Sequence, residues 1–258
     1  MAQAFSGGGD PRRSLGLLWG TAEQGRRGPK PSRSAEEVIA AAVALADAEG
    51  LSALSMRRVA EAVGLSAMAL YTYVPSKAEL IDVMLDRVAA EALDPPPEAR
   101  TWRERLEFIA RQRWLLGQRH PWTLQVAQHR PPLGPNTLAR VETALRAIDG
   151  IGLSDLEMDH VIRVLHDYVG GALRATLEAR EVEQHSELSD EQWLSLNTAL
   201  LHDIVDLERF PTSIRVSEAR RAAYKHVLDR SRAFDFGLQR VLDGIDAFVA
   251  TRRPDPAP

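Results

Sequence analysis

The chain of 258 residues contains no cysteine, which removes several kinds of chemistry at once. Disulfide frameworks, thiol nucleophiles and cysteine-ligated zinc or iron–sulfur centres are excluded. Long apolar runs are also missing: the longest, such as residues 39–46, are short and amphipathic, so we expect no membrane span. The N-terminus lacks the apolar core of a secretory signal, which predicts a cytoplasmic protein.

Strand-like alternation and the common catalytic motifs are scarce as well. Alanine, leucine, glutamate and arginine dominate, which predicts an all-α fold. No G-x-S-x-G, phosphate-binding glycine loop or H-E-x-x-H occurs. Glu157-x-x-His160 has the spacing of a di-iron ligand pair, but such bundles need a second copy and further carboxylates. We therefore predict no enzyme, no cofactor and no metal site.

Charge is distributed unevenly along the chain. The net charge is −4, yet residues 1–33 carry +4 and the remainder −8. An acidic body with a basic leading arm suits a protein that meets DNA at one end. We expect residues 1–33 to be a flexible extension, whose Arg26, Arg27, Lys30 and Arg33 can enter a minor groove. The alternative is an unstructured solubilising tail.

Residues 55–74 (SMRRVAEAVGLSAMALYTYV) have the pattern of a helix-turn-helix. Gly64 can take the left-handed conformation that ends one helix, and Ala60 is small enough for two helices to cross closely. Leu70 is expected to pack on the first helix, while Ser55 and Ser66 are suited to cap the two helices. A capping box, Ser34 to Glu37, opens a preceding helix. An αα-hairpin without nucleic acid remains the alternative from this spacing alone.

The second helix of the hairpin is the candidate DNA reader. Small, apolar or hydroxyl-bearing residues lie on or near its outer face: Ser66, Ala67, Met68, Ala69 and Thr72. They could contact base edges or thymine methyls. The predicted DNA-contacting residues are Arg26, Arg27, Lys30, Arg33, Ser55, Arg57, Ser66, Ala67, Met68, Ala69, Tyr71, Thr72, Tyr73 and Lys77. Because the second helix offers no Arg, Asn or Gln, sequence discrimination is expected to come partly from Arg57, the arm and DNA shape.

Residues 49–88 resemble the TetR family of bacterial transcriptional repressors. The match consists of Gly50, Ser55-x-Arg57-Arg58-x-Ala60, Gly64, Leu70-Tyr71-x-Tyr73-Val74, Lys77 and Leu80 at fixed spacing. It continues more weakly through Trp102, His120-Pro121-Trp122, Leu133-Gly134-Pro135-Asn136 and Tyr168-Val169-Gly170-Gly171, which are similar to the tetracycline-repressor branch. The resemblance covers roughly residues 26–250 and implies that Tyr71, Tyr73 and Lys77 contact phosphates.

The pattern and the resemblance together predict the organisation of the chain. We expect a flexible basic extension (1–33), a three-helix helix-turn-helix head (34–80) and a loose tail (254–258). Between them, a connecting helix leads into a helical ligand-binding and dimerisation bundle (81–253). The resemblance implies that two apolar stripes build a four-helix dimer interface, although they could instead serve only the intrachain core. The stripes comprise Val161, Leu165, Tyr168, Val169, Ala172 and Leu173, and Phe234, Leu238, Val241, Leu242, Ile245 and Phe248.

The resemblance also implies an effector pocket among the middle helices. Its candidate lining residues are Leu93, Ile109, Arg113, Trp122, Gln125, Gln128, His129, Arg130, His166 and Asp167. Tetracycline repressors hold a drug–magnesium chelate through a histidine and a glutamate, and the matching positions here are Ala127 and Arg174. These departures argue against a tetracycline–magnesium effector, though His129 lies close by in sequence.

The resulting hypothesis is a cytoplasmic, homodimeric repressor, nucleoid-associated when it occupies a palindromic operator in double-stranded DNA. A small-molecule effector would release it. The first alternative is a DNA-binding regulator or architectural protein without an effector. The second is a helical ligand-binding or enzymatic module that has no DNA function, which would show no specific duplex binding.

Overall fold

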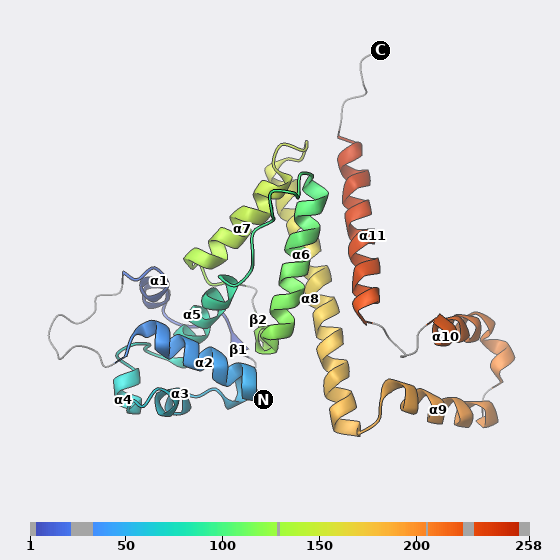
Figure 1. Ribbon diagram of the computed structural model, residues 1–258, viewed down its shortest axis with the longest axis horizontal. Coiled ribbons are helices and arrows are strands. Elements are labelled where there is room, and N and C mark those ends of the chain that lie inside the picture. Colours follow the sequence, from blue (N-terminus) through green and yellow to red (C-terminus); the bar gives the residue numbers. More distant parts are fainter. Residues whose placement is uncertain (1–3, 22–32, 128–129, 205, 224–229, 253–258) are drawn as a thin grey trace, which may run out of the picture.

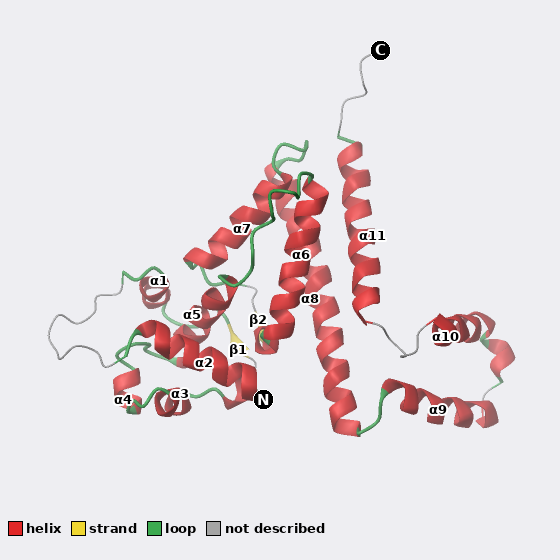
Figure 2. Ribbon diagram, viewed as in Figure 1, coloured by secondary structure: helices red, strands yellow, loops and turns green. Residues whose placement is uncertain are grey.

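A computed structural model describes residues 4–21, 33–127, 130–204, 206–223 and 230–252. Helices make up nearly all of its regular structure, which confirms the predicted all-α class (Figures 1 and 2). The head and the helix leading from it contain α1 (Pro11–Leu18), α2 (Ala35–Glu49), η1 (Leu51–Ala53), α3 (Met56–Ala62), α4 (Ala67–Leu70) and α5 (Lys77–Ala89). The rest contains α6 (Trp102–Arg119), η2 (Pro121–Gln125), α7 (Pro135–Ile148), α8 (Asp155–Ser186), α9 (Asp190–Ile204), η3 (Leu207–Arg209), α10 (Pro211–Ala223) and α11 (Arg230–Ala250).

The helices of the head begin and end where the sequence predicts. Ser34 and Glu37 form a complete capping box on α2, and Gly50 ends that helix with a φ of +79°. Ser55 accepts a hydrogen bond from the Arg58 amide, and Ser66 accepts one from the Ala69 amide. These bonds satisfy amides that have no partner inside their own helix. Side-chain caps therefore fix the start of α3 and of the short α4.

The turn between α3 and α4 depends on Gly64, whose φ is +70°. A Cβ atom would strain this backbone, since side chains rarely adopt that region. Leu70 of α4 is completely buried and belongs to the same core cluster as Val59 and Val63 of α3. The predicted packing of the helix-turn-helix is confirmed.

The core of the head extends beyond the expected boundary at residue 80. The cluster includes α5 as far as Val88, together with Trp122 and Val126 from the segment after α6. Asp86 of α5 also accepts hydrogen bonds from the amide of Thr137 (2.8 Å) and the side-chain amide of Asn136 (2.9 Å) at the start of α7. Because α5 is packed on both sides, it joins the head to the helices that follow.

The expectation that residues 1–33 form a flexible extension is wrong for residues 4–21. β1 (Ala4–Phe5) pairs in parallel with β2 (Val126–Ala127), and α1 packs on α5. Asp82 of α5 accepts hydrogen bonds from the Gly7 amide (2.8 Å) and the Ser14 hydroxyl (3.1 Å). Glycine and basic residues suggested disorder, but buried carboxylates on α5 need the donors that this segment supplies.

Four helices form the main bundle of the C-terminal part: α6, α7, α8 and α11 (Figure 1). Leu106 and Trp114 of α6, Leu165 of α8 and Leu238 of α11 meet in one buried cluster. The Trp114 and Phe234 rings stack with centroids 4.1 Å apart. A core of this size stabilises the bundle through apolar area removed from water.

Helices α9 and α10 lie to one side of the bundle and extend away from the head (Figure 1). Trp193, Leu196 and Leu200 on α9 are more than half exposed. The predicted loose tail at 254–258 lies outside the described residues.

Candidate functional site: a helix-turn-helix surface joined to a helical bundle

The outer face of α4 is the most exposed apolar feature of the head. Met68 is 77% exposed and Tyr71 44%, whereas Leu70 between them is fully buried. Ser66 and Thr72 are exposed as well, and Ala67 and Ala69 are partly exposed. Helical periodicity separates one residue that anchors α4 from those it presents outward. The expected readers of α4 therefore lie together on one surface.

Three residues expected to touch DNA have hydrogen-bond partners inside the head. The Lys77 ammonium donates to the Leu54 carbonyl (2.6 Å), which closes the loop before α3. The Arg33 guanidinium donates to the Val63 carbonyl (3.0 Å) at the helix-turn-helix turn. The Tyr73 hydroxyl donates to the Arg33 carbonyl (3.1 Å), so it also holds the chain entering α2. All three side chains therefore stabilise the head, in addition to any contact they make with DNA phosphates.

Of the remaining residues expected to contact DNA, the structure describes some and not others. Arg57 is strongly exposed and pairs only with Glu61 (3.1 Å), one helical turn away. Ser55 is exposed at the start of α3, where it serves as the cap. Arg26, Arg27 and Lys30 lie outside the described residues.

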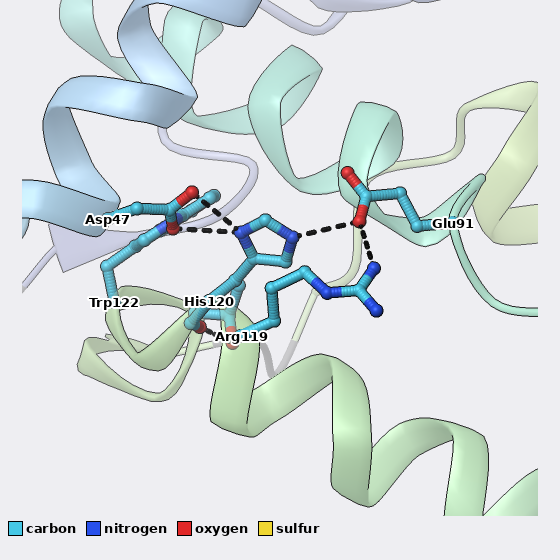
Figure 3. Close-up of polar contacts among 6 residues, drawn as sticks. Asp47, Glu91, Arg119, His120 and Trp122 are labelled. Carbon is cyan, nitrogen blue, oxygen red and sulfur yellow. Dashed lines mark hydrogen bonds and ion pairs between the residues drawn. The ribbon is translucent and has the colours of Figure 1, made fainter.

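A buried histidine joins the head to the bundle. His120, at the end of α6, places Nδ1 2.8 Å from Asp47 Oδ1 of α2 and Nε2 3.1 Å from Glu91 Oε2, just beyond α5 (Figure 3). The Trp122 indole donates to the same Asp47 oxygen (2.8 Å), and the Arg119 guanidinium pairs with Glu91 (2.7 Å). Both nitrogen atoms of this buried ring therefore have a carboxylate partner.

Several predicted pocket residues lie away from the bundle interior. Trp122 is buried in the head core and not among the middle helices. Leu93 is 64% exposed, and Gln125 and Arg130 are also exposed. Trp122 satisfies its indole N–H at Asp47, and the others follow turns that put them at the surface. Gln128 and His129 lie outside the described residues.

Four other predicted pocket residues do come together, between α6 and α8. Ile109 packs against the bundle core, and Arg113 follows it by one helical turn. Across from them on α8 are His166 and Asp167. The charge of Arg113 lowers the pKa of His166, and the charge of Asp167 raises the pKa of Arg113. Burial lowers the pKa of Arg113, the charge of Arg174 lowers it further, and Asp167 opposes the shift. The interior of the bundle thus has a cationic group close to apolar side chains.

Most residues of the predicted dimer stripes are buried within one chain, as members of its own core. The buried ones are Val161, Leu165, Val169, Leu173, Phe234, Leu238, Leu242 and Ile245. Tyr168, Ala172 and Val241 are partly buried against the same cluster. Phe248, 37% exposed, is the most exposed member of the two stripes. Apolar stripes alone cannot distinguish a chain's own core from an interface, since both exclude water.

The described residues offer no arrangement for a resident metal ion. They contain no group of three or more His, Asp or Glu side chains close enough to hold one. Glu157, from the pair with di-iron spacing, accepts a hydrogen bond from the Ser154 amide (2.9 Å) and also pairs with Arg252. It serves as a helix cap. Within the same residues, no helix is both long and apolar enough to span a bilayer.

Sequence reasoning missed the acidic residues that organise the junction. Asp82 and Asp86 are buried among the apolar residues of α5, and Asp47 lies near the end of α2. Acidic groups at such positions require buried donors, so they signal partners from elsewhere in the chain. His120 was noted only for its resemblance to a family motif.

An exposed reading helix, a glycine-hinged turn and a separate helical bundle together define a DNA-binding regulator with a helix-turn-helix head. Comparison with known proteins agrees. The chain matches the profile of "Bacterial regulatory proteins, tetR family" over residues 38–84 and that of "Tetracyclin repressor-like, C-terminal domain" over residues 94–249. The protein belongs to the TetR family of transcriptional repressors, which bind DNA and dimerise.

Individual relatives support the same assignment. The "HTH-type transcriptional repressor DrrR1" of Streptomyces coeruleorubidus is 42% identical over 255 residues, spanning 98% of this chain and 92% of the relative. The solved structure of ActR without ligand, from Streptomyces coelicolor, has a TM-score of 0.70 at 26% identity, covering 88% of this chain and all of ActR. The ActR complex with actinorhodin has a TM-score of 0.68 at 26% identity, covering 84% of this chain and 96% of ActR.

Replacing the junction histidine should destabilise the protein. In His120→Gln, the amide cannot contact Asp47 and Glu91 from opposite sides, so one carboxylate loses a hydrogen bond and keeps only its contact with Trp122 or Arg119. We expect a loss of about 1–3 kcal/mol in the free energy of unfolding, measured by urea denaturation. His160→Gln, an exposed histidine on α8, is the matched control. Equal effects of the two substitutions would contradict the role assigned to His120.

His166 should make the protein sensitive to acid. Burial, then the charges of Arg113 and Arg163, lower the pKa of His166 from 6.5 to about 3. Between these values the unfolded chain binds one more proton than the folded one, so stability rises with pH across this window and falls on acidification. At about 1.4 kcal/mol per pH unit, acidification from pH 6.5 to pH 5 should lower stability by about 2 kcal/mol through this residue.

The measurement compares urea unfolding of the wild-type protein and His166→Gln over that pH range. The variant should lose less stability on acidification, because glutamine does not titrate. His160→Gln again serves as the control and should follow the wild type. An identical pH dependence in all three proteins would contradict a neutral His166.

Proposed function

We propose that two copies of this repressor place their α4 helices in successive major grooves of a palindromic operator, and that a small organic molecule in the bundle releases them. The observation that carries the proposal is the outward face of α4, which has Met68 and Tyr71 exposed beside a fully buried Leu70. In helix-turn-helix dimers the two half-sites lie one helical turn, about 34–36 Å, apart.

The chemistry of α4 favours a particular mode of reading. Its outward residues can make apolar contacts with thymine methyls and single hydrogen bonds through hydroxyl groups. Strong bidentate pairing with guanine or adenine is not available from this helix. DNA shape and the exposed Arg57 would then add to discrimination between sequences.

An effector would act through α6. Arg113 lies near the middle of this helix and His120 directly follows its end, seven residues further on, which is about 10 Å along the axis. A ligand that shifts α6 would therefore move the histidine that Asp47 of the head and Glu91 hold. ActR was solved in complex with (S)-DNPA and with actinorhodin, which supports a small organic molecule as the effector class.

Release also has an energetic requirement. A ligand that binds both conformers equally shifts nothing, and reversing a 1:99 balance takes about a 10⁴-fold preference for one conformer. The bundle must therefore bind the effector more tightly when the two heads are spaced wrongly for the operator.

The partner subunit would bind the outer faces of α8 and α11. Val164 is 53% exposed on α8, and Phe236 is 65% exposed on α11, on the side away from the bundle core. Exposed apolar groups on adjacent helices are typical of an interface between identical subunits. This surface replaces the buried stripes predicted from the sequence.

Phe236→Glu should convert the dimer to a monomer, since it would place two charges in an apolar interface. Analytical ultracentrifugation would measure the change, and operator affinity should fall with it. Leu138→Glu, at a 42% exposed position of α7, is the matched control and should stay dimeric. A dimeric Phe236→Glu protein would place the interface elsewhere.

The operator itself is identified by selecting bound sequences from random duplex DNA with the purified full chain. We expect an inverted repeat. Tyr71→Phe should weaken binding to all selected sequences by a similar factor, because phosphate contacts carry no sequence information. Met68→Ala should change which bases are preferred within each half-site. Recovery of no preferred duplex would end the proposal, whereas a specific operator that no ligand releases would favour a regulator without an effector.

A further inference from the structure

Arg113 has no hydrogen-bond or ion-pair partner among the described residues. Its Nε is completely buried and makes no hydrogen bond. Other arginines of α6 are paired: Arg103 contacts Asp243 (2.6 Å), and Arg111 contacts Asp235 (2.6 Å). A guanidinium nitrogen that is buried without a hydrogen bond costs free energy, which a ligand group that accepts from the guanidinium could recover.

The groups around Arg113 leave its positive charge uncompensated. Arg174 of α8 adds a second positive charge, while Asp167, the acidic group acting on Arg113, is itself exposed to solvent. His166 is kept neutral by its surroundings and supplies no charge. The local balance is therefore positive, and a small anion would be attracted to it.

The neighbouring surface is apolar. Ile109 lies one turn before Arg113 and packs against the bundle core, while Trp114 beside it stacks on Phe234. One turn after Arg113, Gly117 lies directly against Leu173, so no larger side chain fits there. A ligand suited to these surroundings has an apolar body and a single acidic group.

We propose that Arg113 binds the acidic group of the effector, which is therefore an organic acid with an aromatic or aliphatic body. The guanidinium offers two parallel N–H donors to a carboxylate or to a deprotonated hydroxyl group. His166 lies beside the pair and provides one neutral N–H donor. This assignment rests on the proposed effector-released repressor and specifies the class of molecule that releases it.

The test uses the purified full chain and three probe pairs: benzoate, 2-naphthoate and anthracene-9-carboxylate, each with its amide. Thermal unfolding and isothermal titration calorimetry measure binding in the absence of DNA. At least one carboxylate should raise the Tm of the wild type, and its amide should not. In Arg113→Met, which keeps an unbranched apolar stem but removes the guanidinium, affinity for that carboxylate should fall by about 10- to 100-fold.

Arg146→Met is the matched control. Arg146 lies on α7 with a 77% exposed side chain that pairs with Glu142, and its loss should leave carboxylate binding unchanged. Without ligand, Arg113→Met should unfold at a Tm no lower than the wild type, which shows that the variant still folds. The inference is overturned if no carboxylate binds, if amides bind equally well, or if Arg113→Met retains the affinity.

Operator release, measured separately with the selected duplex, distinguishes this failure from that of the proposed function. If only uncharged molecules release the operator, the result supports effector-released repression and contradicts acid binding by Arg113. If carboxylates bind through Arg113 yet never affect operator binding, the result supports the anion site and contradicts effector-released repression.

Discussion

The contact of His120 with two carboxylates is the interaction on which the rest of the molecule depends. Asp47 belongs to the head, Glu91 follows the connecting helix and His120 ends the first helix of the bundle. Because the ring is buried, each of its nitrogen atoms must have a partner. The head, α5 and α6 can therefore move relative to one another only if this contact rearranges.

Buried acidic groups on α5 extend the same constraint along the chain. Asp82 binds the N-terminal segment, and Asp86 binds the start of α7. Burial raises the pKa of Asp82, while the hydrogen bonds from Gly7 and Ser14 oppose that shift. Carboxylates that are costly to bury without donors thus hold two separate segments on one helix. The connecting helix α5 packs on α2 of the head and on α7 of the bundle.

Arg113 in the bundle differs from these carboxylates in its hydrogen bonding. Carboxylates at the junction are satisfied by donors from the chain, whereas the buried Nε of Arg113 has no acceptor among the described residues. A group that is satisfied fixes the structure, and a group left unsatisfied makes the structure responsive to a molecule that can satisfy it. The two arrangements are joined by a single helix, since α6 holds Arg113 and leads directly into His120.

The sequence by itself determined the local features: the caps at Ser34, Ser55 and Ser66, the turn at Gly64 and the inward Leu70. These depend on residues within one or two helical turns, where spacing predicts contact. It also indicated the family and brought Arg113, His166 and Asp167 into one list. Only the tertiary structure showed that the apolar stripes of α8 and α11 are a chain's own core, that Trp122 belongs to the head, and that residues 4–21 pack on α5. An apolar or acidic side chain needs a partner, but periodicity cannot say from which distant segment that partner comes.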